Sequence, residues 1–416
     1  FGIIITILAL AQLLESRMGL FEVTPTNEKQ LNDFIELSQK LKLDLWKHPS
    51  IGQPVKFSTE SDAEHVTYIR SHLAELNLDL RIVNENLDDT ISKEIKDNEV
   101  KRIHSQFKAA GAAGIETYFA PHKEYNNWLQ SLSDQNSKFI SVVNIGKSYE
   151  GKDMNVIKLS TGPKKETIFI DGGIHAREWL GVSSVVWILN KLVSGFKTNN
   201  ADVKDILNRF EIYILPITNP DGYEKTRKGG KDRLWRKNTM PVENGCLGVD
   251  LNRNFDADFG RTGVSSDPCN IVYPGSRAFI APETINFRDF VLSIKDKLKL
   301  FVSFHAYSQL LLTPWAYTQT PPSDNDEMMR VANLMADSIY KKSGKRYIVG
   351  SPANILYAAS GGCYDWVKKI GVKYSYTFEV RPDNQDRSGF VAPVEWISPA
   401  GDELYEAIIV AAKSVK

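Results

Sequence analysis

The chain has 416 residues and a mass of 46.9 kDa, which is enough for two or three domains and at least one large core. Its hydrophobic fraction of 42% and charged fraction of 25% are ordinary for a globular protein. The 51 basic residues balance 51 acidic ones, which argues against nucleic acid or an anionic membrane as partner. Residues 1–108 carry 13 basic and 17 acidic residues, against 38 and 34 in residues 109–416. This split fits one part of the chain docking on the other as well as it fits chance variation.

The chain begins with the apolar run FGIIITILALAQ, which is too short to cross a membrane and is typical of a signal-peptide core. An Ala-Leu-Ala pattern at residues 9–11 provides a cleavage signal. We therefore expect residues 1–18 to be the remainder of a signal peptide and the protein to be secreted. In a secreted protein, Cys246 and Cys269 could close a short loop, which leaves Cys363 unpaired.

Residues 19–86 predict a small domain with the element order β-α-β-β-α-β. The expected strands cover 19–25, 42–47, 53–59 and 79–85, and the expected helices cover 27–41 and 61–76. Ser61 and Glu64 form a capping box at the start of the second helix. This order is typical of a ferredoxin-like α+β domain. The polar, weakly helical segment 87–112 leads into KAAGAAG and is expected to be a connector or a site of proteolysis.

From residue 113 onward, predicted strands alternate with predicted helices. The strands are expected at 139–145, 154–159, 167–171, 211–217, 299–305 and 374–380. The helices are expected at 179–193, 202–210, 282–298, 326–343, 363–370 and 398–416. This alternation predicts an α/β fold with a mixed, mostly parallel central sheet and helices on both faces. Ligands of such sheets bind beyond the carboxyl ends of the strands.

Two histidines end predicted strands: His175 follows TIFIDGGI and His305 follows LKLFVSF. Glu178 lies three residues after His175, where a helix should begin, so the two side chains can converge on one cation. Two histidines and one carboxylate leave a coordination position open, as in catalytic zinc sites. HxxE alone is a weak signal, because a capped helix start with a hydrogen-bonded histidine looks the same. His305 at a second strand end favours the metal site.

Seven motifs follow one another along the chain. They are HAREW (175–179), NPDGYE (219–224), RLWRKN (233–238), GVDLNRNF (248–255), FHAYSQ (304–309), YAASGGCYDW (357–366) and YTFEVR (376–381). Together they resemble the secreted zinc metallocarboxypeptidases of the pancreatic A/B type, prosegment included, over about residues 19–416. The resemblance implies a zymogen with an inhibitory prodomain at 19–86, an activation segment at 87–112 and a zinc carboxypeptidase catalytic domain at 113–416.

The resemblance also implies the parts of an active site. One zinc ion per chain would be held by His175, Glu178 and His305, and Asp250 would hydrogen-bond the first of these histidines and set its tautomer. Glu379 would be the general base that takes a proton from water and delivers it to the leaving amine. Without the motif around it, a glutamate at a strand end is more often solvated or paired in a salt bridge.

Further residues would bind the substrate. Arg236 would stabilise the oxyanion that forms at the scissile carbonyl. The terminal carboxylate of the substrate would be held by Asn252, Arg253 and Tyr357, and the next subsite would be lined by Arg177 and Tyr307. Arginine suits the first task because its planar fork pairs with a carboxylate through two hydrogen bonds. A surface arginine and a packed aromatic residue remain alternative interpretations of the last two.

Tyr364 occupies the position that decides specificity in the family. An acid there goes with C-terminal Lys or Arg, and an aliphatic residue goes with apolar side chains. Ala316, Pro352 and Thr377, also at pocket positions, add no charge, and Asp365 belongs to a pair that does not discriminate between subtypes. A buried cation without a counter-charge is costly, so we predict neutral, mainly apolar or aromatic C-terminal residues. The alternatives are a B-like enzyme with basic preference and a non-catalytic relative that binds zinc or peptides.

The resemblance pairs Cys246 with Cys269 in a disulfide and leaves Cys363 as a free thiol beside the pocket. Expected partners are peptide and protein C-termini as substrates, the chain's own prodomain as an intramolecular inhibitor, and a trypsin-like protease that cleaves after Lys108 or Arg102. We expect a secreted, digestive monomer that binds neither nucleic acid nor membranes.

Overall fold

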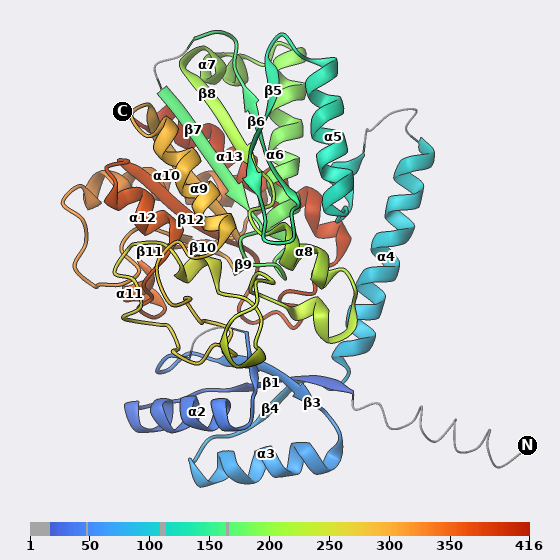
Figure 1. Ribbon diagram of the computed structural model, residues 1–416, viewed down its shortest axis with the longest axis vertical. Helices are drawn as coiled ribbons and strands as arrows, with labels where there is room; N and C mark the ends of the chain where they lie inside the picture. The colour runs from blue at the N-terminus through green and yellow to red at the C-terminus, as the bar shows by residue number, and fades with distance from the viewer. Residues whose placement is uncertain (1–16, 47–48, 109–113, 164–165) are drawn as a thin grey trace, which may run out of the picture. The chain divides into compact units, whose positions relative to one another are not determined.

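The computed structural model describes residues 17–46, 49–108, 114–163 and 166–416 (Figure 1). The predicted signal peptide therefore lies outside the described residues, except for its last two positions. The chain divides into two compact units between Lys93 and Glu94, and each is described by itself.

The first unit is an α+β domain with a four-stranded antiparallel sheet in the order β2-β3-β1-β4. Its elements are β1 (Met18–Val23), α2 (Glu28–Lys40), β2 (Asp44–Leu45), β3 (Val55–Glu60), α3 (Ala63–Glu75) and β4 (Arg81–Asn84). Phe21 and Phe57 from the sheet and Phe34 from α2 pack in its core. The predicted ferredoxin-like order is confirmed, although the second strand is only two residues long.

The start of α3 differs from the prediction by one residue. Asp62 is the N-cap, and its carboxylate accepts a hydrogen bond from the backbone N–H of His65 at 2.9 Å. Ser61, the predicted cap, donates its hydroxyl to the carbonyl of Arg17 instead. Both residue types satisfy free amide groups at a helix start, so the sequence alone does not choose between neighbours.

The predicted weakly helical segment is one continuous helix of 22 residues, α4 (Leu87–Lys108). The part of α4 that follows Lys93 belongs to the second unit and contacts the rest of that unit through polar side chains. Asn98 exchanges two hydrogen bonds with the backbone of Phe119, at 2.7 and 3.0 Å, and Arg102 pairs with Glu124. Because the contacting face is polar, the periodicity of apolar residues underestimates this helix.

The second unit is built on an eight-stranded mixed sheet in the order β11-β10-β12-β9-β7-β8-β6-β5 (Figure 1). The strands are β5 (Ile140–Lys147), β6 (Asp153–Leu159), β7 (Glu166–Gly172), β8 (Phe210–Leu215), β9 (Leu298–Ser308), β10 (Leu310–Leu312), β11 (Ile348–Gly350) and β12 (Tyr374–Asp383). The central strands β12, β9, β7 and β8 are parallel, and their carboxyl ends therefore share one edge. The mixed, mostly parallel sheet is as predicted.

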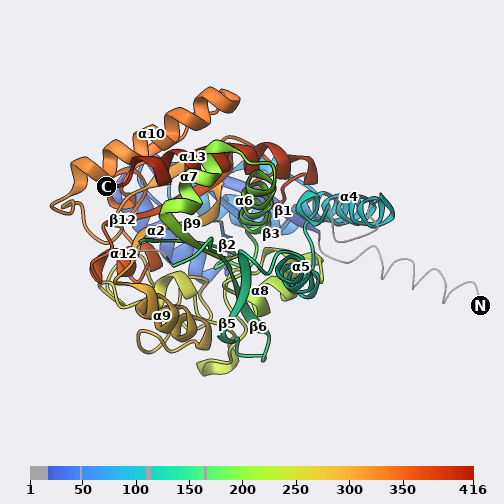
Figure 2. The same ribbon diagram turned by 90° about the horizontal axis from the view of Figure 1, so that it is seen from above.

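Helices lie on both faces of this sheet, with α6, α13 and α10 on one side and α9 and α12 on the other (Figure 2). The helices are α5 (His122–Gln135), α6 (Trp179–Lys197), α7 (Ala201–Arg209), α8 (Pro220–Thr226), α9 (Pro282–Ile294), α10 (Asn325–Ser343), α11 (Pro352–Ile355), α12 (Cys363–Lys369) and α13 (Ile397–Ser414). The short 3-10 turns are η1 (Ile115–Thr117), η2 (Gly230–Leu234), η3 (Glu243–Gly245), η4 (Leu251–Arg253) and η5 (Val394–Trp396). The elements α5, α8, α11, β10 and β11 were not among those predicted.

The helix α6 is central to the fold. By its length and composition it could cross a membrane, and no other helix in the described part of the chain meets that criterion. It packs against β9, β7 and α13, and most of its residues are buried. A helix that is apolar all round in this setting is a core helix.

Candidate active site

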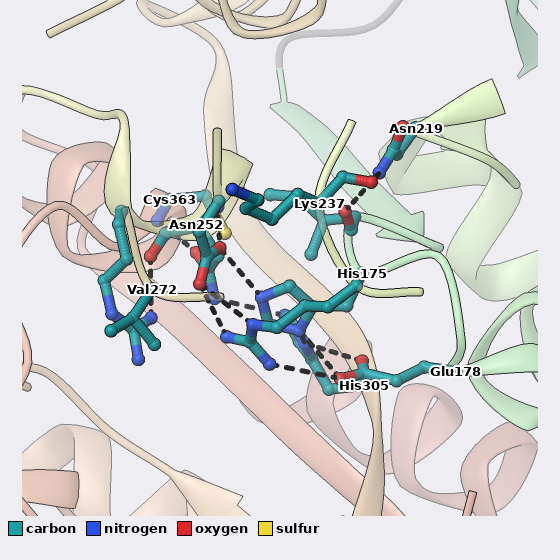
Figure 3. Close-up of polar contacts among 12 residues, drawn as sticks. His175, Glu178, Asn219, Lys237, Asn252, Val272, His305 and Cys363 are labelled. Atoms are coloured by element: carbon teal, nitrogen blue, oxygen red, sulfur yellow. Dashed lines mark hydrogen bonds and ion pairs between the residues drawn. The ribbon is translucent and has the colours of Figure 1, made fainter. Parts of the chain in front are cut away.

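Three side chains predicted to bind metal meet at the carboxyl edge of the sheet (Figure 3). His175 follows β7, Glu178 is the N-cap residue of α6, and His305 lies near the end of β9. The Nδ1 atoms of His175 and His305 lie 2.7 and 3.0 Å from the two carboxylate oxygens of Glu178. The two Nδ1 atoms are 3.1 Å apart. All three side chains are buried.

This donor set fits a cation. Two imidazole nitrogens and a carboxylate present lone pairs to one point. A proton there can join only one pair of these atoms at a time, whereas a metal ion can bind all of them. Two histidines and one carboxylate, with a coordination position left open, are the ligands of a catalytic zinc site. The residues present therefore fit zinc, as predicted.

Asp250 links the metal site to Arg236. Its Oδ1 lies 3.2 Å from Nε2 of His175, and its Oδ2 accepts a hydrogen bond from Nε of Arg236 at 2.9 Å and forms an ion pair with a terminal guanidinium nitrogen at 2.8 Å. Although burial opposes ionisation, Arg236 and His175 hold the pKa of Asp250 well below its usual range. Asp250 thus contacts both the histidine ring and the arginine, and the contact with the arginine was not among the predictions.

Glu379 lies on β12, opposite His305 in the parallel register of β12 and β9. Side chains in register on neighbouring strands point to the same face, so the carboxyl of Glu379 lies beside the metal site. Loss of hydration and the nearby carboxylate of Glu178 raise the pKa of Glu379 above its usual range.

The loop motif NPDGYE has a structural role beside this site. Asn219 caps α8, and its side-chain amide donates to the carbonyl groups of Ile174 and Lys237, at 3.3 and 3.1 Å (Figure 3). These carbonyls belong to the segments that carry His175 and Arg236. One buried asparagine therefore holds the two segments at a constant separation.

Of the predicted carboxylate-binding residues, Asn252 contacts a metal ligand. Asn252 and Arg253 form the end of η4, and the Asn252 amide nitrogen is 3.5 Å from Nε2 of His305. Arg253 donates to the carbonyls of Gly263 and Asn252. Tyr357 lies between α11 and α12 and is partly exposed. Gly361 has a φ of +77°, and a Cβ there would lie 2.1 Å from the carbonyl oxygen of Arg253, so glycine is required for this close approach.

Arg177 and Tyr307 both pack against the ring of Phe390, a residue that sequence analysis did not identify. The Arg177 guanidinium lies 4.2 Å from the centre of the Phe390 ring, and the Tyr307 ring packs edge-on against that ring at 5.0 Å. Arg177 is fully buried, so the alternative interpretation as a surface arginine is wrong. No motif or spacing in the sequence points to Phe390.

A buried ion pair lies beside this group. Arg233 donates to both carboxylate oxygens of Glu94 on α4, at 2.6 and 2.8 Å. The same guanidinium donates to the carbonyls of Arg177 and Phe390, at 2.9 and 2.7 Å. Arg233 is the first residue of the RLWRKN motif, which was its only signal in the sequence.

The pocket residues and the cysteines complete the site. Tyr364 and Asp365 are buried at the start of α12. A Cβ placed on Gly362 would be 3.5 Å from the Tyr364 ring and 3.8 Å from the side-chain oxygen of Asn252, so both side chains lie beside Gly362. The predicted disulfide between Cys246 and Cys269 is present. Cys363 is free, as expected, and fully buried.

The fold and the site define a zinc hydrolase whose metal lies at the carboxyl edge of an α/β sheet. The family model described as zinc carboxypeptidase matches residues 125–407, and the model described as carboxypeptidase activation peptide matches residues 21–94. The chain belongs to the zinc carboxypeptidase family and is a zymogen of its A/B type.

Relatives agree over most of the length. Carboxypeptidase A2 of Rattus norvegicus is 35% identical over 388 residues, which cover 92% of this chain and 90% of the relative. Carboxypeptidase B of Astacus astacus is 40% identical over 304 residues, 72% of this chain and 98% of the relative. The crystal structure of carboxypeptidase A from Helicoverpa armigera has a TM-score of 0.86 at 27% identity and covers 96% of this chain and 98% of that one.

Proposed function

We propose that this zymogen yields a secreted exopeptidase that hydrolyses the C-terminal peptide bond of peptides and proteins, with preference for neutral apolar or aromatic C-terminal residues. The observation that carries the proposal is the zinc triad with a carboxylate in register beside it, Glu379 opposite His305. A metal site and an adjacent base are what hydrolysis of an amide requires.

Each residue near the metal has a distinct task in this reaction. When bound, zinc acts as a Lewis acid that polarises a carbonyl oxygen and acidifies water. Glu379 accepts the proton of the attacking water and passes it to the leaving amine. Arg236, held by a hydrogen bond and an ion pair to Asp250, donates to the oxygen on which negative charge develops. Because Asp250 fixes the guanidinium in advance, little reorganisation is needed when that charge appears.

The substrate is held by its free carboxylate. Asn252 lies next to the metal ligand His305, Arg253 follows it in η4, and Tyr357 lies on another loop. Anchoring the terminal carboxylate there places the last peptide bond, and no earlier one, at the metal. Arg177, Tyr307 and Phe390 line the next subsite of the peptide.

The pocket chemistry supports an A-like preference over a B-like one. Tyr364 brings no charge to the position that decides specificity. The relatives include enzymes named for each type, and both are under half identical to this chain, so the residue at this position is the better guide. A non-catalytic role is disfavoured because the zinc ligands, Glu379 and Arg236 are all retained.

Activation is proposed to occur when a trypsin-like protease cleaves after Lys108 or Arg102 and removes the residues before that bond. Of the two candidate bonds, that after Lys108 is favoured. Arg102 lies within α4 and is paired with Glu124 and Glu99, and a protease must unfold such a segment before cleavage. The prodomain (19–86) inhibits the enzyme, the mature enzyme is a secreted monomer, and its role is digestive.

The test is the activity of the zinc-loaded protein on blocked dipeptides that end in Phe, Leu or Arg, before and after limited trypsin treatment. We expect activity on Phe and Leu only after treatment, with an N-terminus close to residue 109. Preference for Arg would contradict the A-like assignment. Unchanged activity in Glu379→Gln would contradict the mechanism.

A further inference from the structure

Two loop segments that carry active-site residues are joined through the side chain of Asn238. Its backbone N–H donates to the carbonyl of Val249 at 3.2 Å, and its Oδ1 accepts the backbone N–H of Val249 at 2.8 Å. The side-chain oxygen therefore takes the place that a backbone carbonyl has between paired strands, and two hydrogen bonds join the segments. Asn238 and Val249 are both fully buried, so these bonds are shielded from water.

This junction sets Arg236 against Asp250. Arg236 lies two residues before Asn238. Asp250 directly follows Val249, and its Oδ2 accepts a hydrogen bond from Nε of Arg236 at 2.9 Å. The backbone carbonyl of Arg236 accepts the N–H of Ala176, in the segment of the first metal ligands, at 3.0 Å. A shift of Asn238 relative to Val249 therefore changes where the Arg236 guanidinium lies relative to the metal site.

Glu283 decides which way the amide of Asn238 faces. The Nδ2 of Asn238 donates to Oε2 of Glu283 at 3.0 Å. The two ends of an amide have nearly the same shape, so packing alone does not orient the group. An ionised carboxylate only accepts hydrogen bonds, and it therefore keeps the amide nitrogen on its own side and the amide oxygen towards Val249. In the reversed orientation, the amide nitrogen would face the N–H of Val249, and two donors would oppose each other.

The position of Glu283 calls for a carboxylate. Glu283 lies in the first turn of α9 and is fully buried. Its Oε1 accepts the backbone N–H of Tyr149 at 3.0 Å, while its Oε2 accepts the amide of Asn238. A glutamine would offer only one acceptor oxygen to these two donors. Because a buried charge is costly unless it is paired, a carboxylate at this place indicates that both contacts contribute.

We propose that Glu283 is a positioning residue for catalysis: through Asn238 it fixes the segment of Arg236 and so keeps the guanidinium where the oxyanion forms. This rests on the proposed function, in which Arg236 stabilises that charge. A guanidinium fixed in advance contributes more to the transition state than to the bound substrate, since the charge appears on the oxygen only as the reaction proceeds. Loss of the contact should therefore lower kcat and leave KM nearly unchanged.

An exchange of the two partners tests the contact. Glu283→Gln, nearly identical in shape, turns an amide nitrogen towards that of Asn238, so that two donors oppose each other. Adding Asn238→Asp restores the pairing in reverse, because the new carboxylate accepts both the N–H of Val249 and the new amide nitrogen. We expect kcat of the activated, zinc-loaded enzyme to fall about 10- to 100-fold in Glu283→Gln. The double variant should recover most of that loss.

Two further measurements separate positioning from a loss of structure. KM for the best of the blocked dipeptides ending in Phe, Leu or Arg should change by no more than about twofold. A phosphonate peptide carries negative oxygens where the oxyanion develops, and its inhibition constant should rise by about the same factor as kcat falls. A variant that was merely less stable would lose zinc or unfold at a lower temperature, with kcat per zinc-loaded molecule and the inhibition constant unchanged. Metal analysis and thermal denaturation detect that case.

Asn286→Ala is the matched control. Asn286 also lies on α9, and its amide donates to the carbonyl of Lys147, in the turn whose Tyr149 N–H binds Glu283. The control loosens α9 without removing the partner of Asn238 and should leave kcat unchanged. Glu283→Met, which removes both acceptors without opposing two donors, tests the same contact if Glu283→Gln does not fold. Unchanged kcat in a folded Glu283 variant, or no recovery in the double variant, overturns the proposal. Absence of any hydrolysis by the activated wild-type protein contradicts the proposed function itself.

Discussion

Loss of the Glu94 carboxylate should release α4 from the catalytic unit. In the ion pair, Glu94 is 2% and Arg233 is 0% exposed, and both carboxylate oxygens accept hydrogen bonds from the guanidinium. Glu94→Ala leaves a buried guanidinium without its counter-charge, which typically costs about 3–5 kcal/mol. The lower end applies, because Arg233 keeps the carbonyls of Arg177 and Phe390 as partners. A cost of about 3 kcal/mol raises the equilibrium constant for opening on the order of 100-fold.

Limited proteolysis measures this opening. At low trypsin concentration, cleavage within a helix follows the population of its open form, so the initial rates of cleavage after Lys96 and Lys101 should rise by about the same factor. Glu99→Ala removes the same group from an exposed position on α4, where its pair with Arg102 is worth at most about 1 kcal/mol. Equal cleavage rates in the Glu94 and Glu99 variants would refute the reasoning.

Three further predictions concern the catalytic unit. Glu379→Gln should lower kcat at least 100-fold, the usual contribution of a general base, with zinc content by metal analysis unchanged; full zinc with full activity would contradict its role. Asp250→Ala should weaken zinc binding about 10- to 100-fold in a chelator competition, and an unchanged affinity would contradict the orienting role of Asp250. Burial raises the pKa of Asp365 to about 8, so the folded protein keeps a proton that the unfolded chain loses above about pH 4. The wild type should therefore lose up to about 1.4 kcal/mol of stability per pH unit between pH 5 and 7 relative to Asp365→Asn. Urea denaturation measures this, and a stability difference between the two proteins that is the same at both pH values would contradict it.

Much of the fold could be predicted because its signals are local. The alternation of apolar runs and helical patterns from residue 113 onward predicts an α/β sheet, and β7, β9 and β12 formed close to the predicted ranges. The helix α4 shows the limit of this reasoning. Its contacting face carries Asn98 and Arg102, so the apolar periodicity that usually reveals a packed helix is absent.

Strand ends and a three-residue spacing made the zinc ligands candidates, and the motif resemblance identified them. His175 and Glu178 are close in sequence, and His305 ends a neighbouring parallel strand. The partnership of Asp250 with Arg236 is different, since it depends on loops whose course no local pattern describes. There the motif resemblance located the residues, and the structure supplied their contacts.

The sequence by itself indicated the two-part organisation through its local patterns, and the resemblance of its ordered motifs to a known family implied the ligands of the metal and the disulfide partners. Only the tertiary structure decided which groups are buried together. Glu94 and Arg233 are 139 residues apart, and the Arg177 guanidinium packs on the ring of the distant Phe390. Such groupings depend on how distant segments pack. The cost of burying a polar group or charge depends on what surrounds it, and those surroundings exist only in the folded chain.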